Sequence, residues 1–247
     1  MKIYDDPDSL VTGIYDHLKD LFTSPLPDDP PVHIALAGGN TPRAFYDYLA
    51  SRPEGEIRWN KIHLWWGDER CVPPGNSESN YRMVREKLLD RIDICARNVH
   101  RIRGEANPDS EALRYSKEIE ENLPISSTGL PVFDLILLGI GEDGHTASIF
   151  PDSDFKNEST GYSMVTSHPK NGQSRITLTL PVLNQARRVI FMVSGGSKAD
   201  MVEMIIGKQD EAIDLPAAKV FPEEGELIWF LDRDAAIHLN RQEKKSI

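Results

Sequence analysis

Residues 133–146 read FDLILLGIGEDGHT, an apolar run that ends in a glycine-rich turn. Such a run, without polar alternation, is typical of a parallel strand buried on both faces. Four further apolar runs have the same form, and each is followed by Gly or a polar turn: Val32–Ala37, Ile62–Trp66, Val189–Val193 and Leu227–Leu231. The sequence therefore predicts five buried strands.

Helical patterns separate these strands, over Ser9–Phe22, Pro42–Ser51, Ser79–Ile94, Asp109–Leu123 and Lys198–Ile206. Alternation of strand and helix predicts a three-layer, Rossmann-like α/β fold, with a mainly parallel sheet flanked by helices. Ile176–Leu180 alternates and predicts an extra strand near an edge. The polar stretch Asp152–Gly172 is expected to be a loop that could cover a site. No repeat or linker divides the chain, so one domain over residues 1–247 is expected.

Composition excludes several classes of function. The 247 residues carry a formal net charge of −11, so the chain has no general attraction to nucleic acid or to an anionic membrane. No apolar run approaches the roughly 18 residues of a membrane span, and the first residues lack a signal-peptide pattern. Cys71 and Cys95 are expected to be reduced thiols. We expect a cytoplasmic protein, monomeric or a small homo-oligomer, with neither a nucleic-acid nor a membrane partner.

In open α/β sheets, ligands bind beyond the carboxyl ends of the strands, so the loops there are the candidate site. The first loop is Gly38-Gly39-Asn40-Thr41, followed by Pro42. Two glycines and a helix start, with Thr41 as the expected cap, favour an anion cradle of backbone N–H groups. The alternative is a tight turn with nothing bound. The loop lacks the GxxxxGK[ST] pattern of a Walker A site.

The second loop places three charged residues, Asp68, Glu69 and Arg70, directly after a buried strand. The planar guanidinium of Arg70 could bind a carboxylate, a phosphate or a developing oxyanion. The alternative is a solvated loop with an internal ion pair.

The third loop, residues 139–146, matches GxGxxG and carries His145 two residues after Asp143. Dinucleotide binding is disfavoured, because the match starts late in the chain and Glu142 and Asp143 would repel a pyrophosphate. A titratable ring with a neighbouring carboxylate favours acid–base catalysis instead. A structural histidine, or a metal bound by Asp68, Glu69 and His145, stays open as an alternative.

The fourth loop, residues 194–198 (SGGSK), places Lys198 at a helix start, where a cation is unfavourable unless it serves an anion. Arg175 is a further candidate cation, and a solvent-facing Lys198 is the alternative. Together the four loops indicate a small phosphorylated substrate and proton transfer. A GxSxG elbow and an HExxH zinc motif are both absent from the sequence.

The chain resembles the 6-phosphogluconolactonase family, within the superfamily that includes glucosamine-6-phosphate deaminase. Matching motifs occur in the family's order: ALAGGNTPRAFY, WWGDERCVPPGNSESNYRM, FDLILLGIGEDGHTASIFP, RITLTLPVLNQARRVIF and SGGSKA. The family usually has Ser at the position of Asn40. The resemblance implies a sugar-phosphate isomerase/lactonase type of fold and hydrolysis of 6-phospho-D-glucono-1,5-lactone, without a metal or an organic cofactor.

The resemblance also implies roles for the site residues. His145 would act as general base on the attacking water, Asp143 would orient its ring, and Arg70 would face the oxyanion. The phosphate and sugar would be bound by the remaining candidates: Gly38, Gly39, Asn40, Thr41, Asp68, Arg175 and Lys198.

Two other functions remain as alternatives. The deaminase relatives have Glu just before the Pro that follows the His loop, where this chain has Phe150, and their counterpart of Asp68-Glu69-Arg70 typically reads DEY. Both differences favour the lactonase. A sugar-phosphate sensor without catalysis is the second alternative. Such a sensor would tolerate loss of His145 and Asp143, and the presence of both residues disfavours it.

Overall fold

The computed structural model describes residues 1–23, 30–151 and 161–239. Its main sheet has seven strands in the order β1-β10-β9-β6-β2-β3-β5, and every pair in it is parallel. The strands are β1 (Lys2–Tyr4), β2 (Val32–Leu36), β3 (Ile62–Trp66), β5 (Val99–His100), β6 (Leu135–Leu138), β9 (Arg188–Val193) and β10 (Glu226–Asp232). All five predicted strands are confirmed, and β6 is almost fully buried.

The order of the strands creates a crevice between β2 and β6. From β2 the chain builds outward through β3 to β5, then returns to the other side of β2 with β6. The loops after β2 and β6 therefore leave the sheet in opposite directions, which opens a space at their carboxyl ends.

A second sheet of three antiparallel strands, β4 (Asp68–Arg70), β8 (Ser174–Leu178) and β7 (Ser163–Ser167), lies beside the first. It corrects three expectations. The charged residues after β3 form a strand. Residues 176–178 of the expected extra strand do form one, but it is the middle strand of this sheet and not an edge, and Leu180 already begins a helix. The expected loop 152–172 contains β7, while its residues 152–160 lie outside the described part. Local patterns missed these strands because β4 and β7 are short and partly polar.

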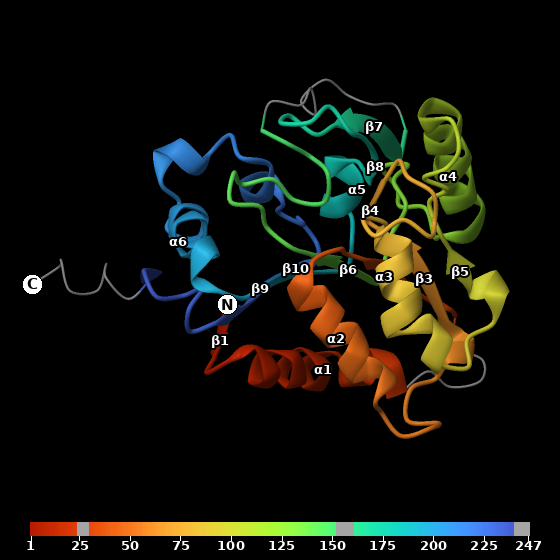
Figure 1. Cartoon of the computed structure of the whole chain (residues 1–247), viewed down its shortest axis with the longest axis horizontal. Helices are drawn as coiled ribbons and strands as arrows, with labels where there is room; N and C mark the ends of the chain where they lie inside the picture. Colours follow the sequence, from red (N-terminus) through yellow and green to blue (C-terminus); the bar gives the residue numbers. More distant parts are fainter. Residues whose placement is uncertain (24–29, 152–160, 240–247) are drawn as a thin grey trace, which may run out of the picture.

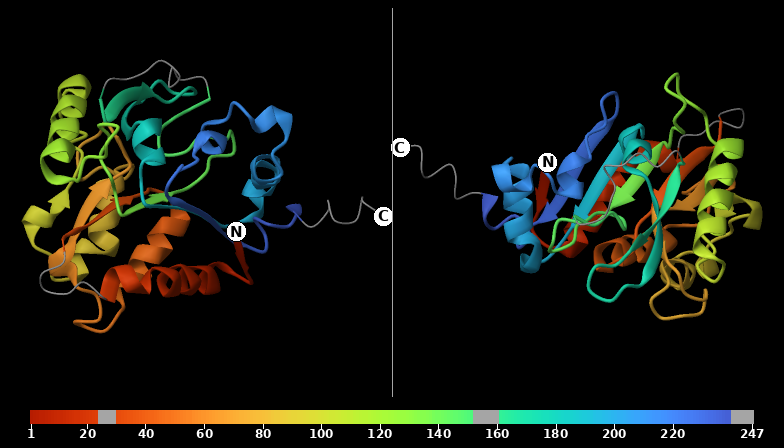
Figure 2. Two further views of the ribbon diagram at one scale, coloured as in Figure 1. Left: turned by 180° about the vertical axis from the view of Figure 1, so that it is seen from behind. Right: turned by 90° about the horizontal axis from the view of Figure 1, so that it is seen from above.

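Helices cover both faces of the main sheet, which confirms the expected α/β class. The helices are α1 (Pro7–Thr23), α2 (Asn40–Ala50), α3 (Asn80–Lys87), α4 (Pro108–Asn122), α5 (Leu180–Asn184) and α6 (Ala199–Ile206). In Figure 1, α1 and α2 lie below the main sheet, whereas α4, α5 and the small sheet lie above it. Figure 2 shows the parallel strands side by side, with α6 and α4 at opposite ends.

Helix ends follow local chemistry. Ser79 caps α3 by accepting a hydrogen bond from the Arg82 N–H, but this helix ends at Lys87 and not at Ile94 as its pattern predicts. Residues 89–91 continue only as a short 3₁₀ turn. Helix α2 begins at Asn40 after Gly39, so Thr41 lies inside the first turn and is not the cap. No helix in the described residues is both long and apolar enough to span a bilayer.

Candidate active site

A cleft of about 430 Å³ opens at the carboxyl ends of β2, β3, β6 and β9, at the crevice where the strand order reverses. All four candidate loops reach it. Nine of the ten candidate residues line it: Gly38, Gly39, Asn40, Thr41, Asp68, Arg70, His145, Arg175 and Lys198. Asp143, the tenth, does not line the cleft itself, but it lies in hydrogen-bond contact with His145, which does.

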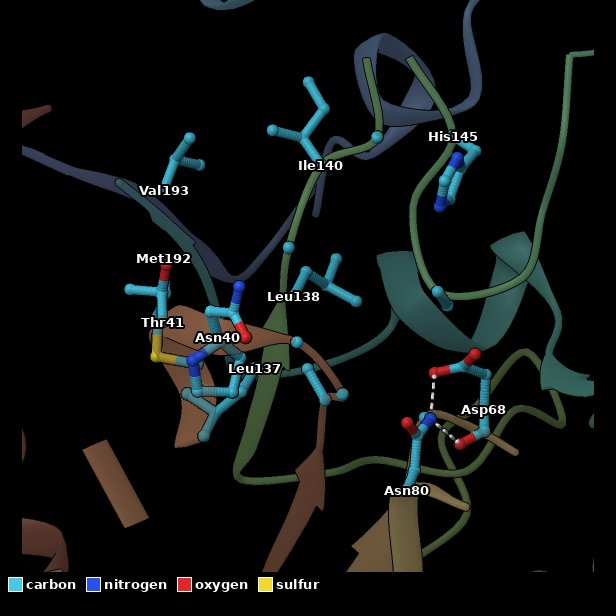
Figure 3. Close-up of a pocket in the computed structure, with 18 of the residues that line it drawn as sticks. Asn40, Thr41, Asp68, Asn80, Leu137, Leu138, Ile140, His145, Met192 and Val193 are labelled. Carbon is cyan, nitrogen blue, oxygen red and sulfur yellow. Dashed lines mark hydrogen bonds between the residues drawn. The ribbon is translucent and has the colours of Figure 1, made fainter. Parts of the chain in front are cut away.

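The loop after β6 folds back so that His145 and Asp143 form a pair. Asp143 Oδ1 lies 2.5 Å from His145 Nδ1 and 3.2 Å from its backbone N. Because a carboxylate accepts hydrogen bonds, Nδ1 carries the proton, and Nε2 is left as the basic atom. Figure 3 shows the His145 ring on this loop, at the side of the cleft that also holds Asp68 and Asn80.

Gly141 is required by this arrangement. A Cβ at position 141 would lie 2.1 Å from His145 Nδ1 and 2.4 Å from Asp143 Oδ1, so only glycine allows the pair to pack on the backbone. Burial tends to raise the pKa of Asp143, but the charge and hydrogen bonds of His145 outweigh it and hold the pKa below its usual value. The Phe150 ring packs 4.9 Å from the His145 ring.

Strand β4 aims Asp68 into the cleft. The residue is 6% exposed, and its carboxylate accepts hydrogen bonds from Ser148 Oγ (2.6 Å) and Asn80 Nδ2 (3.3 Å). Asn80 Nδ2 also donates to the Asp68 carbonyl (3.0 Å), and Figure 3 draws both Asn80 bonds as dashed lines. Asp68 therefore keeps a fixed orientation at the cleft wall.

Two arginines stand opposite each other across β4 and β8. Arg70 pairs in register with Arg175, so two cations share one side of the cleft. Burial and the charge of Arg70 both lower the pKa of Arg175. Arg70 Nη1 donates to the Glu78 carbonyl (2.5 Å), but its buried Nε finds no partner among the described residues. Like charges held this close favour an anion between or beside them.

Glu69 points away from the cleft, which removes it from the suggested metal-ligand set. Its carboxylate accepts hydrogen bonds from the backbone N–H groups of Arg70, Asn80 and Tyr81 and from Ser79 Oγ, at 2.7 to 3.0 Å. Burial raises its pKa although these four donors act in the opposite direction. Glu69 holds the start of α3 against β4.

The loop after β2 borders the cleft with the N-terminus of α2. Gly38 is required because a Cβ there would lie 2.1 Å from Asn80 Oδ1. Thr41 Oγ1 lies 2.8 Å from Ser194 Oγ, which joins this loop to the one after β9. Residues 38–41 therefore place a helix N-terminus at the cleft, the end of a helix that favours an anion.

The loop after β9 is held by a buried residue at the end of β10. Asp232 accepts hydrogen bonds from the Gly195 N–H (3.0 and 3.1 Å) and the Ala235 N–H (2.8 Å). Lys198 Nζ, at the end of this loop, lies 3.8 Å from Glu142 Oε1. The pair is long and Glu142 is largely exposed, so Lys198 can exchange this partner for a ligand.

Several side chains that line the cleft or support it were not singled out from the sequence: Asn80, Ser148, Ser194, Ser197 and Asp232. Ser194 and Ser197 lie within the SGGSK motif, and Asp232 directly follows an apolar run, so their places after strands could have indicated them. Asn80 and Ser148 reach Asp68 from a helix start and from a turn, and no local pattern signals that contact.

The chain matches the family model described as glucosamine-6-phosphate isomerases/6-phosphogluconolactonase over residues 5–229. It is 44% identical over 211 residues to the 6-phosphogluconolactonase of Haemophilus influenzae, which covers 85% of this chain and 88% of the relative.

Solved structures give the same picture. The crystal structure described as devB protein has a TM-score of 0.89 and 41% identity, with 96% of this chain and 98% of that chain covered. The 6-phosphogluconolactonase of Trypanosoma brucei has a TM-score of 0.80 and 30% identity, with the same coverage of 96% and 98%.

Proposed function

We propose, from the premise that the chain belongs to the glucosamine-6-phosphate isomerase/6-phosphogluconolactonase family, that His145 is the general base of its reaction. The protein is an enzyme that hydrolyses 6-phospho-D-glucono-1,5-lactone to 6-phospho-D-gluconate, the second step of the oxidative pentose phosphate pathway. One observation carries the proposed role. His145 donates Nδ1–H to Asp143 and lines a cleft that also holds two arginines and the start of α2.

The reaction needs an activated water and a stabilised oxyanion. His145 Nε2 takes a proton from the water as its oxygen attacks C1 of the lactone. The same nitrogen then returns the proton to the ring oxygen as the C1–O bond breaks, so that the ring opens to the free acid. Asp143 stabilises the imidazolium formed between these steps.

The cations divide between the two ends of the substrate. Arg70, which lines the cleft, faces the negative charge that develops on the carbonyl oxygen. Arg175, Lys198 and the backbone of residues 38–41, with Asn40 and Thr41 at the helix start, bind the phosphate. Asp68 binds the sugar hydroxyls.

The residue beside His145 favours the lactonase over the deaminase. Phe150 occupies the position where the deaminase relatives have Glu, and its ring packs against the His145 ring. An apolar ring there supplies no carboxylate for amine chemistry, whereas ester hydrolysis does not need one.

Lactone generated in situ from glucose 6-phosphate tests this function. Ring opening should be accelerated above its spontaneous rate by the wild-type protein, and His145→Ala should lose about 10²–10⁴-fold of that acceleration. His145→Ala should still bind 6-phosphogluconate. Persistent turnover in this variant would refute the assignment of the base. Ammonia release from glucosamine 6-phosphate without lactonase activity would support the deaminase instead.

The proposal extends to the setting in which the enzyme acts. Cys71 and Cys95 are both unpaired, which suits a reducing cytoplasm. We propose a cytoplasmic enzyme, monomeric or a small homo-oligomer, that has no nucleic-acid partner, consistent with its net charge of −11.

A further inference from the structure

Ser148 contacts every strand of the small sheet. Its Oγ donates to Asp68 Oδ2 on β4 (2.6 Å), its N–H donates to Thr177 Oγ1 on β8 (3.2 Å), and its carbonyl accepts from Thr166 Oγ1 on β7 (2.9 Å). The residue is fully buried, so no solvent competes for these bonds. Ser148 does not line the cleft and cannot touch substrate.

The chain between His145 and Ser148 is short and constrained. Thr146 and Ile149 exchange backbone hydrogen bonds of 2.9 and 3.4 Å, and Thr146 Oγ1 donates to the Gly139 carbonyl (2.9 Å). Ala147 has a φ of 47°, a left-handed conformation that costs a non-glycine residue about 1–2 kcal/mol. The surrounding contacts must therefore hold this turn in place.

These contacts connect two parts of the site that come from different sheets. The base His145 extends from β6 of the main sheet, whereas Asp68, Arg70 and Arg175 belong to the small sheet. Ser148 is three residues from the base and is bonded to the strands that carry the cations.

We propose that Ser148 is a positioning residue, which fixes the distance between the His145 base and the small-sheet residues Asp68 and Arg70. The expected loss of turnover rests on the proposed function, whereas the expected displacement of the His145 ring does not. Without the Ser148 hydroxyl, the turn loses its bond to β4 and Asp68 loses one of its two donors. Both groups then sample other positions, and catalysis is sensitive to displacements of about 1 Å.

Ser163 offers a matched control. It is a buried serine of the same small sheet, and its Oγ donates to the Ala112 carbonyl (2.8 Å) of α4, outside the cleft. Ser163→Ala removes a hydroxyl of similar burial and should cost similar stability. It leaves the contacts of Ser148 unchanged.

Two readouts test the proposal on the full-length protein. The first is the NMR signal of the His145 ring, assigned by its loss in His145→Ala. That signal should shift or broaden in Ser148→Ala and not in Ser163→Ala. An unchanged signal in Ser148→Ala would overturn the proposal. A shifted signal in a protein with no lactonase activity would refute the proposed function and leave the positioning role intact.

The second readout is kcat for lactone hydrolysis. Ser148→Ala should lower kcat about 10- to 100-fold, while Ser163→Ala changes it less than about twofold at a similar melting temperature. Equal losses in both variants would overturn the proposal. If Ser148 acts partly through Asp68, the double variant Ser148→Ala/Asp68→Asn should lose less than the product of the single losses.

A milder variant keeps the test decisive should Ser148→Ala fail to fold. Thr166→Val is nearly isosteric and removes only the bond to the Ser148 carbonyl. It should shift the His145 signal in the same direction and lower kcat by a smaller factor. No shift and no loss in this variant would count against the proposal.

Discussion

A single methyl group at position 141 should disable the base without removing any functional group. An ideal Cβ on Gly141 would lie 2.1 Å from His145 Nδ1, 2.3 Å from its Cε1 and 2.4 Å from Asp143 Oδ1. Non-bonded carbon contacts settle near 3.5 Å, so the ring must move by about 1 Å or more in Gly141→Ala. A displacement of that size costs about 100-fold in rate, or roughly 2.7 kcal/mol of barrier.

The assay couples lactone formation from glucose 6-phosphate to oxidation of 6-phosphogluconate, with the spontaneous rate subtracted. Gly141→Ala should lower kcat about 100-fold, while binding of 6-phosphogluconate changes little because the cations stay in place. Gly75→Ala is the control, because a Cβ there meets no atom within 4 Å and the residue does not line the cleft. Full activity in a folded Gly141→Ala protein would show that the observed ring position is not the catalytic one.

Three further predictions follow from charge and burial. Arg175→Met and Lys198→Met should each raise KM about tenfold or more with a smaller change in kcat, measured by steady-state kinetics. Unchanged KM values in both variants would place the phosphate-binding site elsewhere. Glu69→Gln should lower the free energy of unfolding, measured in urea, by about 3 kcal/mol, because the new amide NH₂ would meet a backbone N–H, donor against donor. An unchanged unfolding midpoint would contradict the role of Glu69 in capping α3. Burial, with the charges of His63 and His100, lowers the pKa of His33 to about 3. The unfolded chain therefore binds a proton below about pH 6.5 that the folded chain does not, so stability is full above that pH and falls as pH drops toward 3. Between pH 7 and 5 this residue alone should cost about 2 kcal/mol, and His33→Gln should lose correspondingly less in parallel urea titrations.

The main sheet was predictable because burial on both faces leaves an apolar run in the sequence. The same runs placed the loops, since the carboxyl ends of parallel strands meet at one edge. His145 and Asp143 lie two residues apart, so their pairing could be anticipated from spacing alone, although their catalytic roles stay a prediction.

The small sheet was not predictable from local pattern. Asp68–Arg70 reads as a polar loop because its three residues are charged, and its partners as a strand lie elsewhere in the chain. The backbone of Arg70 pairs in register with Arg175, and Glu69 is buried under the start of α3. Asn80 and Ser148 contact Asp68 only after α3 and the turn at 146–149 are in place. Such long-range polar contacts leave no periodic signal in the chain.

The position of β10 bears on when the enzyme becomes active during synthesis. This strand lies between β1 and β9, and Asp232 at its end holds the N–H of Gly195. At 5–20 residues per second, a ribosome makes β10 roughly 10 to 40 s after β2. Until then β9 has an open edge, β1 has no neighbour, and the loop that carries Lys198 lacks its anchor. A nascent chain therefore passes through a stage in which the base and the arginines are already made but the cleft is incomplete, and that stage is the one most exposed to association with other chains.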